Sequence, residues 1–122
     1  MDSKQWKTRI VKEMKQAQTY QPFFISAIET LADILATRDK AREQFEGSGG
    51  SVIVKHTNKG GATNLEKNPA LVAMVDLNRD ALQYWRELGL TPKGLKAIDE
   101  ASMKGKEQSA FGDALDKILG GG

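Results

Sequence analysis

The chain of 122 residues contains no cysteine. Disulfide bonds, thiolate metal sites and cysteine nucleophiles are therefore excluded, and the composition fits a reducing compartment. There is also a single histidine, His56. One histidine cannot form a metal-binding histidine cluster, and it leaves no choice of histidine partners for a serine nucleophile. A lone histidine beside a predicted turn is typical of an ordinary surface position.

Long hydrophobic runs are missing as well. No segment approaches the roughly 20 apolar residues that span a bilayer, and the charged start MDSKQWKTRI is not followed by the apolar core of a secretory signal. The carboxylates show no metal-binding spacing, and the glycine-rich NKGGAT lacks the residue order of a phosphate-binding loop. We therefore expect no enzyme activity, no cofactor, no metal site and no membrane partner.

What the chain does contain is typical of one small, helix-rich domain, with 39% hydrophobic and 28% charged residues. Its net charge is only +2. The positive excess lies at the N-terminal end, where residues 1–20 hold five basic side chains against two acidic ones, a net +3. These basic residues are Lys4, Lys7, Arg9, Lys12 and Lys15.

Hydrophobic spacing predicts two N-terminal helices. The first spans about residues 3–19, with an apolar stripe that includes Trp6 and Ile10 and with lysines on the opposite side. The second spans about 22–46 and has a wide apolar face, which indicates burial on more than one side. The glycine-rich stretch after it, followed by SVIVKH, TNKGG and ATNL, predicts a small β-hairpin.

The clearest local signals surround a third helix. Asn68 and Pro69 are a favourable N-cap and first residue, Gly89 suits a left-handed C-terminal cap, and Thr91-Pro92 starts a short fourth helix. Asn78 lies on the apolar stripe and needs a polar partner or water. The predicted stripe of the third helix is Leu71, Val75, Leu82, Trp85 and Leu88, broadened by Met74 and Ala81.

Together these elements predict a mainly α fold. Two N-terminal helices form an antiparallel hairpin, and a small β-hairpin, a long helix and a short C-terminal helix follow. We expect three parts: a helical core and oligomerisation domain over 1–98, a flexible linker over 99–108, and an amphipathic tail over 109–122. The wide apolar faces on so short a chain favour a homo-oligomer.

Three surfaces are candidates for binding. The basic face of the first helix could neutralise phosphates, which dominate affinity for DNA, although a solvated helix face explains the same pattern. Lys55, His56 and Lys59 on the hairpin form a second basic group with the same two interpretations. The tail could dock in the groove of a protein partner or pack on its own domain. Its apolar residues are Phe111, Leu115, Ile118 and Leu119.

The order of these signals resembles a known family. A helix that opens with NPAL, at residues 68–71, and ends with LGLTP, at residues 88–92, follows a glycine-bearing hairpin and two helices. This order resembles the small subunit of tailed-bacteriophage DNA-packaging terminases, in the branch with an NPAL…LGLTP helix, over about residues 3–98. Trp85 also belongs to the matching pattern.

The resemblance implies a non-catalytic packaging subunit. Such subunits recognise the packaging site on double-stranded viral DNA, assemble as rings of about eight to twelve copies, and engage the large subunit that holds the ATPase and nuclease. The tail often contacts that large subunit. They act in the cytoplasm of the infected bacterial host and are not expected in the mature virion.

One departure leaves the DNA-contacting surface open. Many members of the family begin with a helix-turn-helix, whose second helix enters the major groove. Here the first two helices look long, and the break at residues 19–22 does not indicate a recognition helix. Two alternatives therefore remain: a protein-binding adaptor that regulates a partner ATPase with little DNA affinity of its own, and a small DNA-binding regulator.

Overall fold

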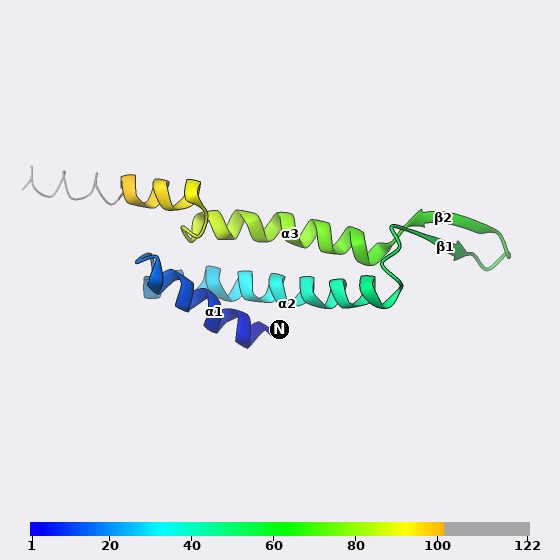
Figure 1. The fold of residues 1–122 in the computed structure, drawn as a ribbon, viewed down its shortest axis with the longest axis horizontal. Coiled ribbons are helices and arrows are strands. Elements are labelled where there is room, and N and C mark those ends of the chain that lie inside the picture. The colour runs from blue at the N-terminus through cyan, green and yellow to red at the C-terminus, as the bar shows by residue number, and fades with distance from the viewer. Residues whose placement is uncertain (102–122) are drawn as a thin grey trace, which may run out of the picture.

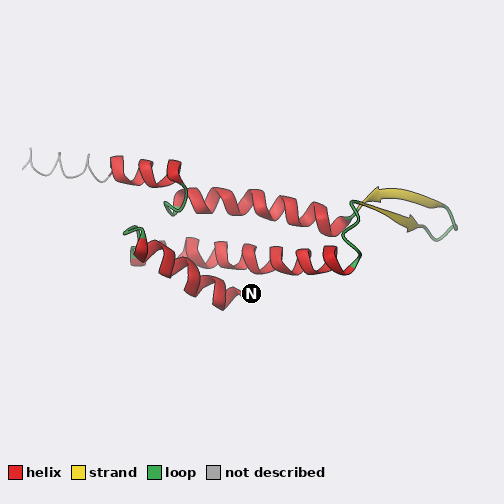
Figure 2. Cartoon of the chain, in the orientation of Figure 1, coloured by secondary structure: helices red, strands yellow, loops and turns green. Residues whose placement is uncertain are grey.

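The computed structural model describes residues 1–101, which form an elongated helical bundle with a β-hairpin at one end (Figures 1 and 2). The elements along the chain are α1 (Ser3–Gln16), the short 3₁₀ turn η1 (Pro22–Phe24), α2 (Ile25–Gly47), β1 (Ile53–Thr57), β2 (Thr63–Lys67), α3 (Pro69–Glu87) and a further helical segment over 92–101. The predicted mainly α fold class and its order of elements are confirmed. The expected ring of copies stays a prediction, because the structure contains one chain.

Helix α1 is closed at both ends by local hydrogen bonds. Asp2 and Gln5 form a capping box, in which each side chain accepts from the other residue's main-chain N–H. The helix ends three residues before the predicted end because Gln18 takes a left-handed conformation, with φ +60°. The N–H of Thr19 then bonds back to the carbonyl of Met14 at 2.9 Å, which completes a Schellman motif.

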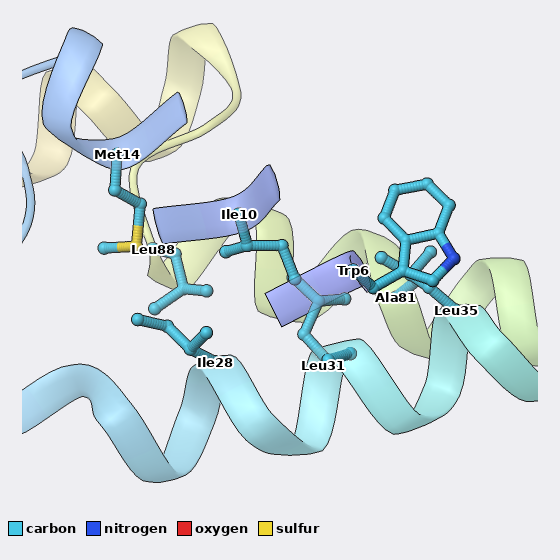
Figure 3. Close-up of a cluster of buried hydrophobic side chains, with 9 residues drawn as sticks. Trp6, Ile10, Met14, Ile28, Leu31, Leu35, Ala81 and Leu88 are labelled. Atoms are coloured by element: carbon cyan, nitrogen blue, oxygen red, sulfur yellow. The ribbon is translucent and has the colours of Figure 1, made fainter. Parts of the chain in front are cut away.

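The hydrophobic core lies where α1 packs across the antiparallel pair of α2 and α3 (Figures 1 and 3). The wide apolar face of α2 is buried on two sides, by α1 and by α3, as the sequence indicated. Because α1 covers only one end of the bundle, the buried side chains of the core lie at that end. The core residues are Trp6, Ile10, Met14, Ile28, Leu31, Ala32, Leu35, Ala81 and Leu88.

The other end of the bundle is an arm that α1 does not cover. It consists of α2 after residue 39, α3 before residue 80, and the hairpin (Figure 1). Among its described residues, only Ala41 and Asn68 are buried. A two-stranded hairpin on a two-helix arm buries little apolar surface, so this part has little stability of its own.

The predicted apolar stripe of α3 is partly wrong. Val75 and Leu82 are 47% and 43% exposed, whereas Ala81 and Leu88 are buried and Met74 is half-buried. Helix α3 thus faces the bundle with positions 74, 81 and 88. Val75 and Leu82 follow these positions by one residue, about 100° around the helix, and point away from α2.

The end of α3 has the predicted glycine cap, and the predicted start of a further helix follows it. Gly89 has φ +73°, and the N–H of Leu90 bonds to the carbonyl of Trp85 at 2.8 Å. Thr91 Oγ1 then caps the next helix by accepting from the N–H of Gly94 at 3.0 Å.

The last helical segment, 92–101, includes the first three residues of the predicted linker. Residues 102–108 and the predicted tail 109–122 lie outside the described residues. The division of the chain into three parts therefore stays a prediction.

Candidate nucleic-acid and assembly surfaces

The five basic residues of α1 differ in whether an acidic side chain forms an ion pair with them. Lys7 Nζ lies 3.0 Å from Glu29 Oε1 of α2, and Arg9 Nε lies 3.1 Å from Glu13 Oε1. These two cations are locally compensated. The other three, Lys4, Lys12 and Lys15, are exposed and make no ion pair with any residue of the described part.

The positions of these three lysines suit contact with an extended anion. Lys12 and Lys15 lie on the side of α1 that faces away from α2, since Trp6 and Ile10 occupy the packed side. Lys4 instead borders a shallow hollow that α2 also lines. Lys15 Nζ also lies 5.2 Å from the ring centroid of Tyr20, which orients its ammonium group near the end of the helix. Lysines spaced along one helix can meet successive phosphates, because each acts as a point charge on a flexible stem.

The second predicted basic group lies on the hairpin, at a different end of the molecule (Figure 1). Lys55 pairs across the ladder with Leu65, and Lys59 is in the turn. His56 is exposed and lies 3.9 Å from Glu66, an ordinary surface arrangement. A single protomer therefore does not bring the two basic groups together, and a continuous basic surface would need several copies.

The turn of the hairpin has a defined conformation. Asn58 Oδ1 accepts from the N–H groups of Gly60 and Ala62, and Gly61 takes φ +82°. This arrangement fixes the antiparallel register from Ile53↔Lys67 to Thr57↔Thr63. Both strands have a free edge within the described residues, because the sheet contains these two strands alone.

Exposed apolar side chains gather on the arm. Among residues 1–101, six of the eight exposed large hydrophobic side chains belong to the arm or border it. We call these six the arm surface, and it includes a shallow hollow of about 340 Å³ beside Val52 and Val75. Such a concentration on a small domain is typical of a protein-binding surface. Its residues are Val52, Ile53, Leu65, Val72, Val75 and Leu82.

A polar cluster links all three long helices, and the sequence did not identify it as a unit. Asp39 on α2 accepts hydrogen bonds from Trp6 Nε1 at 2.8 Å, from the N-terminal amine at 3.0 Å and from Arg38 Nε at 3.1 Å. Arg38 Nη1 donates to Asn78 Oδ1 on α3 at 3.0 Å. Asn78 is exposed, so solvent could satisfy it as well, and its bond to Arg38 joins α3 to α2 at the surface.

This environment also sets the protonation of Asp39, whose side chain is only 18% exposed. Burial raises the pKa of the carboxyl group, but the hydrogen bonds from Trp6 and the N-terminal amine and the charge of Arg38 together outweigh it. The pKa of Asp39 consequently lies below its usual value, and the group is a carboxylate at neutral pH.

Two features are absent from the part of the chain that the structure describes. Across residues 1–101, no three side chains of the His, Cys, Asp and Glu types gather to hold a metal ion. Over the same range, no helix has the length and apolarity to cross a membrane. The predicted tail residues Phe111, Leu115, Ile118 and Leu119 lie outside the described residues.

Comparison with known proteins identifies one family. The family model for "Phage terminase, small subunit" matches residues 3–104, which is most of the chain. No curated protein and no solved structure matches the chain significantly.

Proposed function

The chain belongs to the family of phage terminase small subunits and serves phage DNA packaging, and we propose that it binds packaging-site DNA, assembles as a homo-oligomeric ring and recruits the large terminase ATPase-nuclease. In this proposal the subunit is non-catalytic and uses no cofactor. It acts in the cytoplasm of the infected bacterial cell and does not enter the mature virion.

The observation that carries the DNA-binding part is the row of uncompensated lysines on α1. Lys4, Lys12 and Lys15 are the main contacts, and Lys7 and Arg9 contribute less because Glu29 and Glu13 already pair with them. Lys55 and Lys59 on the hairpin make a second contact in a ring, where neighbouring copies repeat each basic group. Contacts of this kind go to phosphates and read little sequence.

A charge-reversal experiment tests this assignment. Replacing Lys4, Lys12 and Lys15 by Glu should weaken binding to double-stranded DNA strongly. The slope of log affinity against log salt should fall by about 3, one for each phosphate that the variant no longer neutralises. The matched control reverses three exposed lysines elsewhere, Lys40, Lys93 and Lys96. Equal losses for both triple variants would show a general charge effect and refute the assignment to α1.

The arm surface supports the assembly part of the proposal. Its apolar side chains face outward from α3 and the hairpin, and α1 leaves them uncovered. A neighbouring copy that covers this surface would stabilise an arm that packs poorly alone. The two free edges of the hairpin offer further main-chain hydrogen bonds between copies.

Native mass measurement tests assembly through this surface. Val75→Asp combined with Leu82→Asp should shift the protein from rings to monomers, because two buried, unpaired charges would be costly at the interface. Gln83→Asp, at an exposed polar position of α3, is the control and should leave the rings intact. A wild-type protein that stays monomeric at micromolar concentration would exclude the ring.

The adaptor alternative makes a different prediction for DNA binding, not for the predicted tail. Phe111→Ala with Leu115→Ala should abolish capture of the large subunit in either case. If the protein is only an adaptor, the wild type should lack salt-dependent DNA affinity, and reversing the α1 lysines should change nothing. DNA binding that survives the tail substitutions but not the lysine reversals supports the packaging subunit.

A further inference from the structure

The two faces of the β-hairpin differ in charge. Residues that pair directly across an antiparallel ladder lie on the same face, and successive pairs alternate between the two faces. One face carries Val54 with Glu66 and His56 with Asn64, so it includes an acidic side chain. The other face has lysines but no carboxylate, and we call it the lysine face. It consists of the pairs Ile53↔Lys67, Lys55↔Leu65 and Thr57↔Thr63.

Side-chain contacts agree with this division. The hydroxyl oxygens of Thr57 and Thr63 lie 3.2 Å apart on the lysine face. His56 Nδ1 lies 3.9 Å from Glu66 Oε1 on the other face. Glu66 is the only acidic residue of the two strands. Neither lysine of the lysine face makes an ion pair within residues 1–101, so the charge of this face is not compensated there.

The lysine face is open to solvent. The hairpin projects beyond the ends of α2 and α3 (Figure 1). All residues of the two strands except Val54 are exposed, and Leu65 on the lysine face is 71% exposed. Lys67, at the base of the hairpin, also lines the hollow beside Val52 and Val75. The lysine face is therefore available to a partner, and it is continuous with the rest of the arm surface.

Double-stranded DNA fits the lysine face in size and in chemistry. The major groove is about 12 Å wide and admits a two-stranded β-ribbon, whose strands lie about 4.8 Å apart. Lys55 and Lys67 are diagonal neighbours on different strands, about 7–8 Å apart, so their flexible stems can reach phosphates on the two sides of such a groove. Threonine hydroxyls can hydrogen-bond to base edges, and apolar side chains can contact thymine methyl groups. The lysine face has both kinds of side chain.

A second copy of the chain suits this face less well. The lysine face of another copy is basic too, so contact between two such faces would bring like charges together. Covering the apolar side chains of Ile53 and Leu65 with protein would also desolvate the ammonium groups paired across from them. Phosphates would compensate these ammonium groups, so the charge of the face favours DNA as its occupant.

We propose that the lysine face enters the major groove of double-stranded DNA, with its two lysines at phosphates on either side and its two threonines at base edges. The proposal rests on the proposed function and goes beyond it, because the lysines of α1 contact phosphates alone, whereas the hairpin contacts the bases. It also divides the arm surface between two partners. Ile53 and Leu65 face DNA, and the residues left to a neighbouring copy are Val52, Val72, Val75 and Leu82.

Glucosylated DNA tests this use of the groove. A mixed-sequence duplex that contains hydroxymethylcytosine is compared with the same duplex after glucosylation, which fills the major groove with sugar and leaves the phosphates unchanged. Wild-type affinity should fall about tenfold on glucosylation, which is the size of a typical lost base contact. Lys55→Glu with Lys67→Glu should remove this discrimination, since the hairpin then enters neither duplex. The matched control, Lys40→Glu with Lys93→Glu, reverses two other exposed lysines and should keep the discrimination.

Three results would overturn the proposal. Equal wild-type affinity for the two duplexes would exclude the major groove, and this comparison needs no substitution, so no folding defect can obscure it. Discrimination that persists in the variant with both hairpin lysines reversed would show that another part of the chain enters the groove. A native mass that falls in this variant but not in the control would make the lysine face a contact between copies instead.

Failure of this proposal is distinguishable from failure of the proposed function. Salt-dependent binding to the unmodified duplex through the lysines of α1 can persist under each of the three results, which would leave the packaging role intact. A wild-type protein without salt-dependent affinity for either duplex would refute both.

Discussion

The side chain of Asn68 donates a hydrogen bond from Nδ2 to the main-chain carbonyl of Ser51, at 3.0 Å. The same amide nitrogen lies 2.9 Å from Ser48 Oγ, and Oδ1 caps α3 by accepting from the N–H of Ala70. Asn68 thus caps the helix and ties it to the loop after α2. This double role explains why a polar side chain only 4% exposed is tolerated there.

Asn68→Asp should therefore destabilise the protein by about 1–3 kcal/mol, because aspartate keeps the cap but cannot donate to Ser51 and Ser48. The midpoint of urea unfolding measures the effect. Asn64→Asp, on the exposed β2 strand, is the control and should change the midpoint little. An equal loss in both variants would show that the added charge matters and the hydrogen bonds do not.

The contact between Gly94 and the main chain of Arg86 leads to a second prediction. A Cβ atom on Gly94 would lie 2.0 Å from the carbonyl oxygen of Arg86, so Gly94→Ala must displace the segment 92–101 from the end of α3. We expect a loss of about 1–3 kcal/mol in thermal or urea unfolding. Gly47→Ala, at the end of α2 with no atom near the added methyl group, should have no such cost.

Among residues 1–101, Gln18 is the one non-glycine residue with a positive φ angle. Left-handed geometry costs an L-residue roughly 1 kcal/mol, and glycine avoids this cost. Gln18→Gly should therefore raise the melting temperature. Gln16→Gly, two residues earlier at the last residue of α1, should lower it, because glycine has poor helix propensity. The opposite signs of the two changes make the comparison specific, and a fall for Gln18→Gly would disprove this account of the helix end.

The lowered pKa of Asp39 predicts a pH-dependent stability. A carboxyl group whose folded pKa is depressed stabilises the protein fully above its unfolded pKa, near 3.8, and this stability is lost as pH falls through the folded pKa. The wild type should therefore be more stable than Asp39→Asn at pH 7. Melting curves should show that the difference is constant down to about pH 5 and narrows below about pH 4. A difference that grows in acid would contradict the assigned direction.

The sequence predicted the elements of the fold well because their signals are local. Asn68, Pro69, Gly89 and Thr91 act through bonds to residues a few positions away, so the start and stop of α3 could be inferred directly. The end of α1 was placed too late, since the left-handed turn there uses Gln18 and no glycine marks it.

The candidate surfaces were predicted less completely because they depend on packing between helices. The side of α3 that faces α2 is set by where Ala81 and Leu88 meet the core, so Val75 and Leu82 could not be recognised as exposed. The bond between Arg38 and Asn78 joins residues 40 positions apart, and no local pattern indicates it. Likewise, the pairing of Lys7 with Glu29 could not be seen in the charge distribution along α1.

Helix α2 runs from the core, where α1 packs on it, to the hairpin, so it connects the two ends of the molecule. Its first half is held by α1, for example through Lys7 and Glu29, and its last residues lead into the hairpin. Its 23 residues extend over about 35 Å. A tilt of α2 by about 5° about its α1-packed end would therefore move its hairpin end by about 3 Å. A change in how α1 packs on the first half of α2 would therefore be magnified at the hairpin end of the molecule.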